Sequence, residues 1–202
     1  MPGIENGHDA IVEVLLDRGA DASGATPIST AARLGHLNMV EGLHRSGGPV
    51  QPAITPACDA GHAPIVDYLA DSGADPTLRE CMVGAVRGQH SAVVSLLLDR
   101  GATVGWHTDD HGTTLVHLAA TNGDVVVLEK LIGAGAPCTV PDDRGVTPMN
   151  AAARTKKNVP VLEVLLQAGG DVNDVDDKGN SVFKNARSRQ NKKWLKEQGA
   201  TK

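Results

Sequence analysis

The 202-residue chain has few aromatic side chains, which argues against one large globular core. Aromatic residues make up 2 % of the sequence: two Trp, one Tyr and one Phe. Large rings usually provide much of the buried area in a globular core. This chain must therefore pack mainly with Ala, Val and Leu, which favours thin, repeated layers.

Cysteine is also scarce, with three residues that lie far apart. Cys58, Cys81 and Cys138 form no C-x-x-C pair, so we expect neither a disulfide framework nor a zinc site. The sequence instead favours a role for all three as small core residues.

Long apolar runs and catalytic motifs are missing too. No stretch approaches the roughly 20 apolar residues that cross a bilayer, and no basic segment followed by an apolar one opens the chain. We therefore expect an intracellular, cytoplasmic protein that binds no membrane. Neither G-x-S-x-G nor G-x-x-x-x-G-K occurs, so we expect no enzyme, no catalytic residue and no cofactor.

The net charge of −5 is unevenly distributed along the chain. Residues 184–202 contain seven Lys or Arg and one Glu, so the rest of the chain is strongly acidic. The acidic part favours a protein partner of basic or mixed charge and opposes nucleic acid. The basic end is interpreted as a solvated face.

What the sequence does contain is a recurring phrase of the form G-H-x-x-x-V-x-x-L-L-x-x-G-A. Each phrase closes on a glycine, and the gaps between these glycines are 28, 26, 28, 34, 34 and 30 residues: Gly19, Gly47, Gly73, Gly101, Gly135, Gly169 and Gly199. Such periods indicate stacked repeats. The apolar positions have helical spacing, and the closing glycine is typical of a left-handed helix cap.

A second, shorter helical piece precedes most phrases. It opens with Thr-Pro or Thr-Thr and contains adjacent alanines, as in "TPISTAARLGH" (26–36), "TTLVHLAATNG" (113–123) and "TPMNAAARTKK" (147–157). Thr caps a helix, Pro fits its first turn, and the alanines allow neighbouring helices to approach closely. Each repeat is thus predicted to be a short helix, a tight turn, a longer helix and a loop.

The segment "GVTPMNAAARTKKNVPVLEVLLQAGGDVN" (145–173) resembles an ankyrin repeat, and so does "GTTLVHLAATNGDVVVLEKLIGAGA" (112–136). The resemblance recurs in register across nearly the whole chain. It implies an all-α ankyrin-repeat solenoid of stacked helix-turn-helix units forming a single domain, 1–202. We divide it into a partial N-terminal repeat (1–21), five repeats (22–171) and a basic C-terminal capping repeat (172–202).

The repeat lengths predict two kinds of connection. The first three gaps leave room only for short loops. The later gaps leave room for small β-hairpin fingers at about 103–112, 137–145 and 171–179. Pro56 and Gly84 predict irregular first helices in the third and fourth units. In the last unit, Trp194 and Leu195 should face inward, and its second helix should be about one turn short.

Two groups of histidines are candidate metal ligands, but a structural role is favoured for the first. His8, His36, His62 and His90 recur at the internal turns, where the resemblance implies a turn-stabilising residue. Stacked units are also too far apart for two of these rings to share a metal. The string "HTDDH" pairs His107 with His111, but in a finger rather than on a helix. We therefore predict no metal site.

The function implied by the resemblance is protein recognition by a rigid concave surface formed by the short helices and the fingers. Three acidic pairs precede the finger glycines, and we expect their first members, Asp109, Asp142 and Asp176, to hold the turns. Trp106 at a fingertip either contacts a partner or packs against the neighbouring loop. The predicted partner-binding residues are Arg33, Asp59, Arg87, Trp106, Asp110, Thr121, Asp143, Arg154 and Asp177 on a monomer.

Two alternatives remain open. The segment "LLQAGGDVND" (165–174) resembles the context in which ankyrin repeats are hydroxylated on asparagine, which would make Asn173 a modification site and the protein a substrate; the other role for Asn173 is to bond the finger backbone. The incomplete first repeat suggests a regulatory ankyrin segment of a larger enzyme or channel that acts by intramolecular contacts.

Overall fold

The computed structural model describes residues 18–19, 23–156 and 158–201, and these residues form helices without strands. They divide into two compact units, with the division after Ala102. The first unit holds α2 (Ala25–Leu34), α3 (Leu37–Arg45), α4 (Gln51–Ala60), α5 (Ala63–Asp71), α6 (Arg79–Arg87) and α7 (Ser91–Asp99). The second holds α8 (Leu115–Asn122), α9 (Val125–Gly133), α10 (Pro148–Arg154), α11 (Val159–Gln167), α12 (Val182–Asn185) and α13 (Arg189–Glu197).

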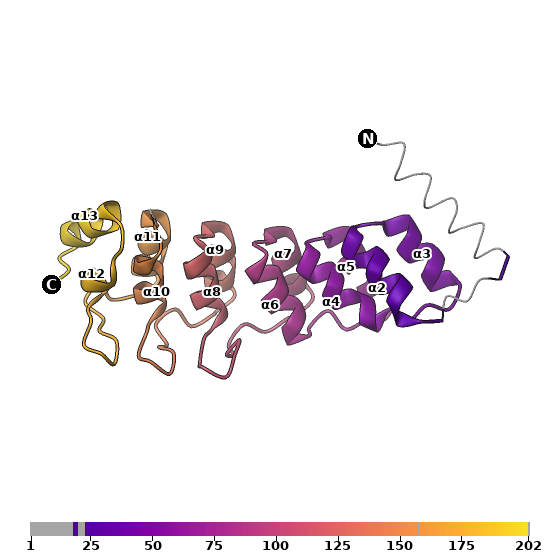
Figure 1. The fold of residues 1–202 in the computed structure, drawn as a ribbon, viewed down its shortest axis with the longest axis horizontal. Coiled ribbons are helices and arrows are strands. Elements are labelled where there is room, and N and C mark those ends of the chain that lie inside the picture. The colour runs from indigo at the N-terminus through magenta and orange to yellow at the C-terminus, as the bar shows by residue number, and fades with distance from the viewer. Residues whose placement is uncertain (1–17, 20–22, 157, 202) are drawn as a thin grey trace. The chain divides into compact units, whose positions relative to one another are not determined.

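Each unit is a stack of helix pairs, as Figure 1 shows. In the first unit the first helices pack in the order α2, α4, α6, and the second helices in the order α3, α5, α7. In the second unit α8, α10 and α12 form one row of helices, and α9, α11 and α13 form the other. The predicted all-α stack of helix-turn-helix units is confirmed, whereas the repeat boundaries and the single domain remain predictions.

The core consists of small and branched side chains, in keeping with the scarcity of rings. Alanines that are almost completely buried lie on facing first helices: Ala31, Ala32, Ala57, Ala85, Ala119, Ala120, Ala152 and Ala153. Leu and Val from the second helices fill the space between the two rows of helices. Each of these side chains contributes roughly 1.5–3 kcal/mol when it is fully buried. Trp194 and Leu195 are buried in the last unit, as expected.

Two predictions about helix length and regularity are wrong. A third, a short first helix with a longer partner, holds only in the second unit, where α8, α10 and α12 have 8, 7 and 4 residues and their partners 9. In the first unit α2 and α4 have 10 residues and are longer than their partners, with 9. Both α4 and α6 are continuous helices despite Pro56 and Gly84. In the last pair α13 has its full 9 residues, and α12 is the reduced helix, with 4. Packing against neighbouring repeats outweighs these local propensities.

A close approach between helices explains the glycine in α6. The side chain of Asp59 in α4 lies directly over Gly84, so that a β-carbon added there would come within 2.8 Å of Asp59 Cγ. A β-carbon at position 84 would therefore require the exposed Asp59 side chain to move away, and it would still lie 3.3 Å from Asp59 Cα. The glycine that sequence reasoning treated as a helix defect thus suits the close approach of α6 to α4.

Side chains at the internal turns connect each repeat to the preceding one. His62 Nε2 lies 3.1 Å from the carbonyl oxygen of Arg33, and His90 Nε2 lies 3.0 Å from that of Asp59. In the second unit Asn158 Nδ2 donates to Ala120 O at 2.9 Å. Each contact satisfies a carbonyl at a helix C-terminus that lacks an intrahelical partner. The predicted structural role is thereby confirmed for His62 and His90, while His8 lies outside the described residues.

One cysteine prediction is wrong. Cys58 and Cys81 are fully buried core residues, as expected, but they are also joined by a disulfide between α4 and α6. Their Cα atoms lie 5.1 Å apart, within the range that a disulfide requires. The separation of 23 residues gave no sign of this pairing, because the contact arises only when neighbouring first helices stack. Cys138 is half-buried, and its Sγ donates to Ala168 O.

The connections differ between the units as the repeat lengths predicted. Short loops join the pairs of the first unit, whereas three finger loops project beside α8, α10 and α12 (Figure 1). The fingers contain no strand among the described residues, so their β-hairpin character is not confirmed. Two isolated antiparallel bridges remain, His107 with Thr114 and Val175 with Ser181.

The partial repeat predicted at the N-terminus cannot be followed in the structure. The partial repeat 1–21 lies almost wholly outside the described residues, which begin with Arg18 and Gly19. Within the described parts of the chain, no helix is long and apolar enough to cross a bilayer.

The tight packing of the alanine layer yields a prediction. The substitution Ala31→Leu should lower the free energy of unfolding by about 1–3 kcal/mol, because Ala31 is 1 % exposed and leaves no room for three more carbons. Urea denaturation measures the change. Arg33→Leu, at an exposed position of the same helix, is the control and should change stability by less than about 0.5 kcal/mol. An unchanged midpoint for Ala31→Leu would refute close packing at this site.

Candidate interaction surface

Each of the three fingers has an aspartate that holds its turn; Asp142 and Asp176 are buried, whereas Asp109 is exposed. Asp109 Oδ1 accepts hydrogen bonds from the backbone N–H groups two and four residues later, both at 3.0 Å. Asp142 and Asp176 repeat this pattern at 2.9–3.0 Å. The predicted turn-holding role of the first aspartate of each pair is confirmed. The backbone turn of each finger is thus held by an aspartate of the same finger.

Asp176 is the most strongly held of these carboxylates, with only 3 % of its side chain exposed. Its Oδ1 accepts from Lys178 N, Asn180 N and Asn180 Nδ2, and its Oδ2 accepts from Asn180 Nδ2, Asn185 Nδ2 and Arg154 Nη2. Burial raises the pKa of Asp176, but the hydrogen bonds from Asn180, Asn185 and Lys178 outweigh it and lower the pKa to about 2. Asp176 is therefore ionised at neutral pH.

Asp142 occupies the same place in the second finger and is also 3 % exposed. Its Oδ2 accepts from Arg144 Nε at 3.2 Å and Nη2 at 2.7 Å. Burial raises the pKa of Asp142, but the hydrogen bonds from Arg144 and from Val146 N–H more than compensate and lower it below its usual value. The Arg144 side chain, 68 % exposed, is thereby held at the fingertip by a buried anion.

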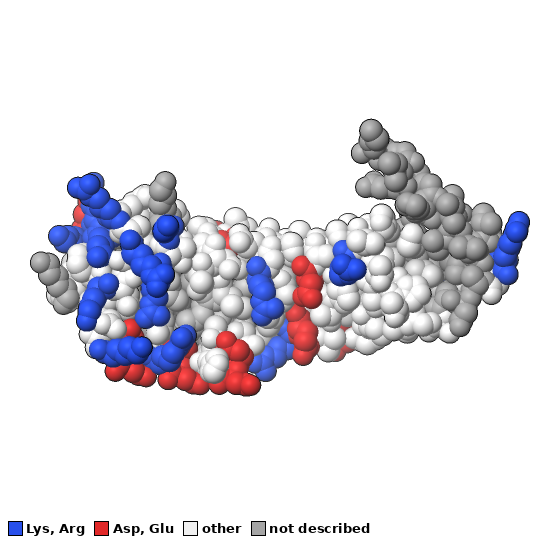
Figure 2. All heavy atoms as spheres, in the orientation of Figure 1, with Lys and Arg blue, Asp and Glu red and all other residues white. Residues whose placement is uncertain are grey.

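The second aspartates of the three pairs are exposed and form an edge of negative charge. We call Asp110, Asp143 and Asp177, which are all exposed, the acidic edge. Figure 2 shows acidic groups gathered along the lower side of the second unit. The backbone N–H groups of two of these residues bond to the preceding finger. Asp143 N–H donates to His111 O at 3.0 Å, and Asp177 N–H donates to Arg144 O at 3.1 Å. These bonds stack one finger on the next and leave the carboxylates facing solvent.

Trp106 lies at the start of the first finger and is half-buried. Its indole Nε1–H donates to Thr103 O at 3.0 Å, three residues back in the chain. The indole group is therefore bonded to its own loop, whereas one of the two expected roles was packing against the neighbouring loop. Its contact with a partner remains a prediction.

The remaining predicted binding residues divide between the two units. Arg33, Asp59 and Arg87 are exposed at matching positions near the ends of α2, α4 and α6 in the first unit. Thr121 and Arg154 lie near the ends of α8 and α10 in the second, where Thr155 Oγ1 donates to Thr121 O at 3.2 Å. The second unit thus brings Thr121 and Arg154 to the same side as the fingers.

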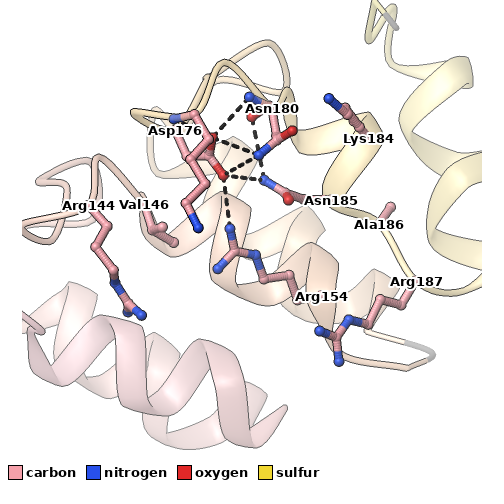
Figure 3. A pocket seen from close by; sticks show the side chains of 10 residues that line it. Arg144, Val146, Arg154, Asp176, Asn180, Lys184, Asn185, Ala186 and Arg187 are labelled. Atoms are coloured by element: carbon pink, nitrogen blue, oxygen red, sulfur yellow. Dashed lines mark hydrogen bonds and ion pairs between the residues drawn. The ribbon is translucent and has the colours of Figure 1, made fainter.

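The structure gathers five basic residues around a cavity of about 460 Å³ in the second unit. Sequence reasoning had named Arg154 and the basic segment 184–202 separately, but it did not predict this grouping. Arg144 and Lys178 come from fingertips, Arg154 from α10, Lys184 from α12, and Arg187 from the segment after α12. Figure 3 labels four of these side chains, Arg144, Arg154, Lys184 and Arg187, and shows Arg154 reaching Asp176. One signal was present in the sequence: a basic residue follows each acidic pair, in "DDHG", "DDRG" and "DDKG".

Family models describe the same repeats that the structure shows. The model for ankyrin repeats in three copies matches residues 3–80 and again 81–176. The chain belongs to the ankyrin-repeat family. This match confirms the resemblance seen in the sequence. Ankyrin repeats are a general module of protein interaction.

Relatives and a solved structure agree with this assignment. The chain is 34 % identical over 152 residues to the ankyrin repeat and KH domain-containing protein mask-1 of Caenorhabditis elegans, matching 70 % of this chain and 6 % of that protein. It is 28 % identical over 134 residues to an L-asparaginase of Dirofilaria immitis, matching 60 % of this chain and 22 % of the enzyme. The human ASB11 ankyrin repeat domain superposes with a TM-score of 0.86 at 22 % identity, over 98 % of this chain and 96 % of that domain.

Asn173 lies in the exposed start of the third finger of this ankyrin-repeat chain. Its side-chain Oδ1 accepts from Thr201 N at 2.8 Å and Thr201 Oγ1 at 3.0 Å, and so connects the finger to the end of the chain. The expected bond to the finger backbone is therefore replaced by a bond to residue 201. Its hydroxylation remains a prediction.

The candidate metal string does not gather ligands. His107 bridges to Thr114 across the first finger, and Asp109 is occupied by backbone N–H groups. In the described ranges no three His, Cys, Asp or Glu side chains lie close enough to hold a metal ion together.

His117 connects this first finger to the second in the ankyrin-repeat stack. Its Nδ1 accepts from Thr114 N–H at 3.2 Å, and its Nε2 lies 2.8 Å from Val146 O, which assigns the proton of the neutral ring to Nε2. Burial lowers the pKa of His117 below 6.5, although the bond to Val146 O opposes the change. Protonating Nδ1 would also remove the bond from Thr114 N–H.

The position of His117 predicts a pH dependence of stability. Because its folded pKa lies below the unfolded value of 6.5, the unfolded chain binds protons first, and stability falls as pH drops below about 6.5. The substitution His117→Asn removes this titration, since Asn150 fills the matching position of the next repeat. Urea denaturation between pH 5 and 8 should show wild type losing stability relative to His117→Asn on acidification. A pH-independent difference would contradict the assignment.

Proposed function

We propose that this ankyrin-repeat chain is a non-catalytic module that presents the first helices and fingers of its second unit to a protein partner of mixed charge. The proposal combines the general role of ankyrin repeats in protein interaction with the acidic edge and the basic cavity on adjoining parts of the fingers. We keep the expectations of a monomer, of an intracellular location, and of no nucleic-acid or membrane binding as part of this proposal.

The observation that carries the proposal is the internal anchoring of the fingers. Asp142 and Asp176 satisfy the backbone N–H groups of their turns, so the finger backbones that carry the exposed charged residues are fixed before any partner arrives. A prebuilt surface loses little conformational entropy on binding. With few aromatic anchors, the interface depends on complementary charges, which set specificity and association rate.

A second candidate is supported by the length of the relatives. The matched segments make up 6 % of the mask-1 protein and 22 % of the L-asparaginase, so both relatives carry the matched repeats within much longer chains. The repeats would then act on another domain of the same polypeptide. The length of the native polypeptide in its source cells, determined by immunoblotting with antibodies against these repeats, separates the two: a chain of about 21 kDa favours the free module.

The acidic edge gives the test of the first proposal. Replacing Asp110, Asp143 and Asp177 together by Ser should weaken partner binding on the order of tenfold, because three exposed charge pairs are lost at about 0.2–1 kcal/mol each. Stability should change by less than about 0.5 kcal/mol, since the turns are held by the other aspartates. Affinity capture with quantitative mass spectrometry identifies the partner and compares its recovery.

The matched control removes the same charge from the second helices by replacing the exposed Glu129, Glu163 and Glu197 with Ser. Partner recovery should match that of wild type. Equal recovery by both triple variants would place the binding surface elsewhere, and a large loss of stability in the aspartate variant would mean that these residues support the turns.

A further inference from the structure

The cavity between α10, α12 and the last two fingers concentrates positive charge on one side of the second unit. Five cationic side chains line it, and they come from five separate places in the chain: Arg144, Arg154, Lys178, Lys184 and Arg187. In Figure 3 the labelled cations come from separate elements on this side of the unit, and a dashed line marks the contact of Arg154 with Asp176. Its volume of about 460 Å³ suits a few side chains rather than a whole domain.

The one acidic residue that lines this cavity does not neutralise it. Asp176 is 3 % exposed, and both of its oxygens are occupied by bonds from Lys178 N, Asn180, Asn185 and Arg154. Its carboxylate oxygens bind the backbone of the third finger and the guanidinium of Arg154. A ligand entering the cavity therefore meets cations and not carboxylate oxygens.

The five cations are unequally engaged within the protein. Arg144 and Arg154 each contact a buried aspartate, which fixes their side chains while leaving further N–H donors of the guanidinium. In the described part of the chain, the side chains of Lys178, Lys184 and Arg187 have neither hydrogen bond nor ion pair. The cavity thus combines positioned guanidinium groups with uncompensated charge, an arrangement that recognises oxyanions.

We propose that this cavity binds an acidic peptide segment, whose carboxylate or phosphate side chains pair with Arg154, Arg187 and Lys184. The inference rests on the proposed function and names the chemistry of the partner at one part of the surface. It also modifies the expectation from overall charge: the acidic edge meets basic groups of the partner, while the cavity receives an acidic group next to them.

The surroundings of the cavity favour a peptide over a nucleic acid. Asp143 and Asp177 expose carboxylates beside Arg144 and Lys178 on the same fingertips, so a continuous phosphate backbone along the fingers would meet alternating repulsion. No aromatic side chain lines the cavity to stack a base. A peptide instead places a few anions in the cavity and directs other groups to the acidic edge. Figure 2 shows this red edge directly below the blue groups.

Fluorescence anisotropy with the full chain tests the proposal. The probes are fluorescein-labelled peptides of one sequence carrying four Glu, four phosphoserines, or four Gln, and a single-stranded oligonucleotide of the same charge as the phosphopeptide. The Glu peptide, the phosphopeptide or both should bind, with affinity that falls as salt rises, while the Gln peptide does not. Because a phosphoserine carries nearly twice the charge of a glutamate, a further peptide with two phosphoserines is compared with the four-Glu peptide, and the stronger of these two identifies the oxyanion.

Two double variants locate the binding. Lys184→Ala with Arg187→Ala removes two cavity cations that hold no other group, and should weaken peptide binding by about tenfold or more, since charged hydrogen bonds are lost. Arg189→Ala with Lys193→Ala is the control: it removes the same charge from α13, outside the cavity, and should weaken binding less than about twofold. Circular dichroism checks that both variants are folded.

Three results would overturn the inference: binding of neither anionic peptide, tighter binding of the oligonucleotide, or equal weakening by both double variants. These outcomes are distinct from failure of the proposed function. If the acidic-edge variant still loses the captured partner while no acidic peptide binds, the interaction module stands and the cavity assignment falls. If acidic-peptide binding depends on Lys184 and Arg187 while partner capture is unaffected by the edge, the cavity assignment stands alone.

Discussion

A two-helix layer of this chain has no interior of its own, and this constraint governs the rest of the structure. Its apolar side chains lie on both faces, so they are removed from water only when another layer packs against each face. The nearly complete burial of Ala31, Ala57 and Ala85 on successive first helices shows how closely the layers approach. Stability is therefore shared between neighbours, and each layer supports the next.

Polar contacts fix the register of this stacking. His62 and His90 in the first unit, and Asn158 in the second, each reach a carbonyl at the end of the preceding first helix. The bond is short-ranged and directional, so it is made only when adjacent repeats are correctly aligned. The hydrophobic effect brings the layers together without such precision, whereas these side chains select one alignment.

The charged residues of the fingers build the surface of the second unit. In each finger one aspartate holds the backbone turn, and its neighbour and the following basic residue are exposed. Asp142 holds the exposed Arg144, and Asp176 holds the partly exposed Arg154, so buried anions position two cations. Opposite charges consequently occupy adjoining strips of the second unit, which suits a partner that itself carries both signs.

The sequence by itself determined the repeat, the helix pairs, the closing glycines and the turn-holding aspartates, because each depends on residues close together in the chain. It did not reveal the disulfide between Cys58 and Cys81, the close approach of Asp59 to Gly84, or the cavity lined by Arg144, Arg154 and Arg187. Those features depend on which side chains meet when separate repeats stack. Local spacing fixes what a repeat looks like, but only the packing of one layer on another decides which of its residues become neighbours.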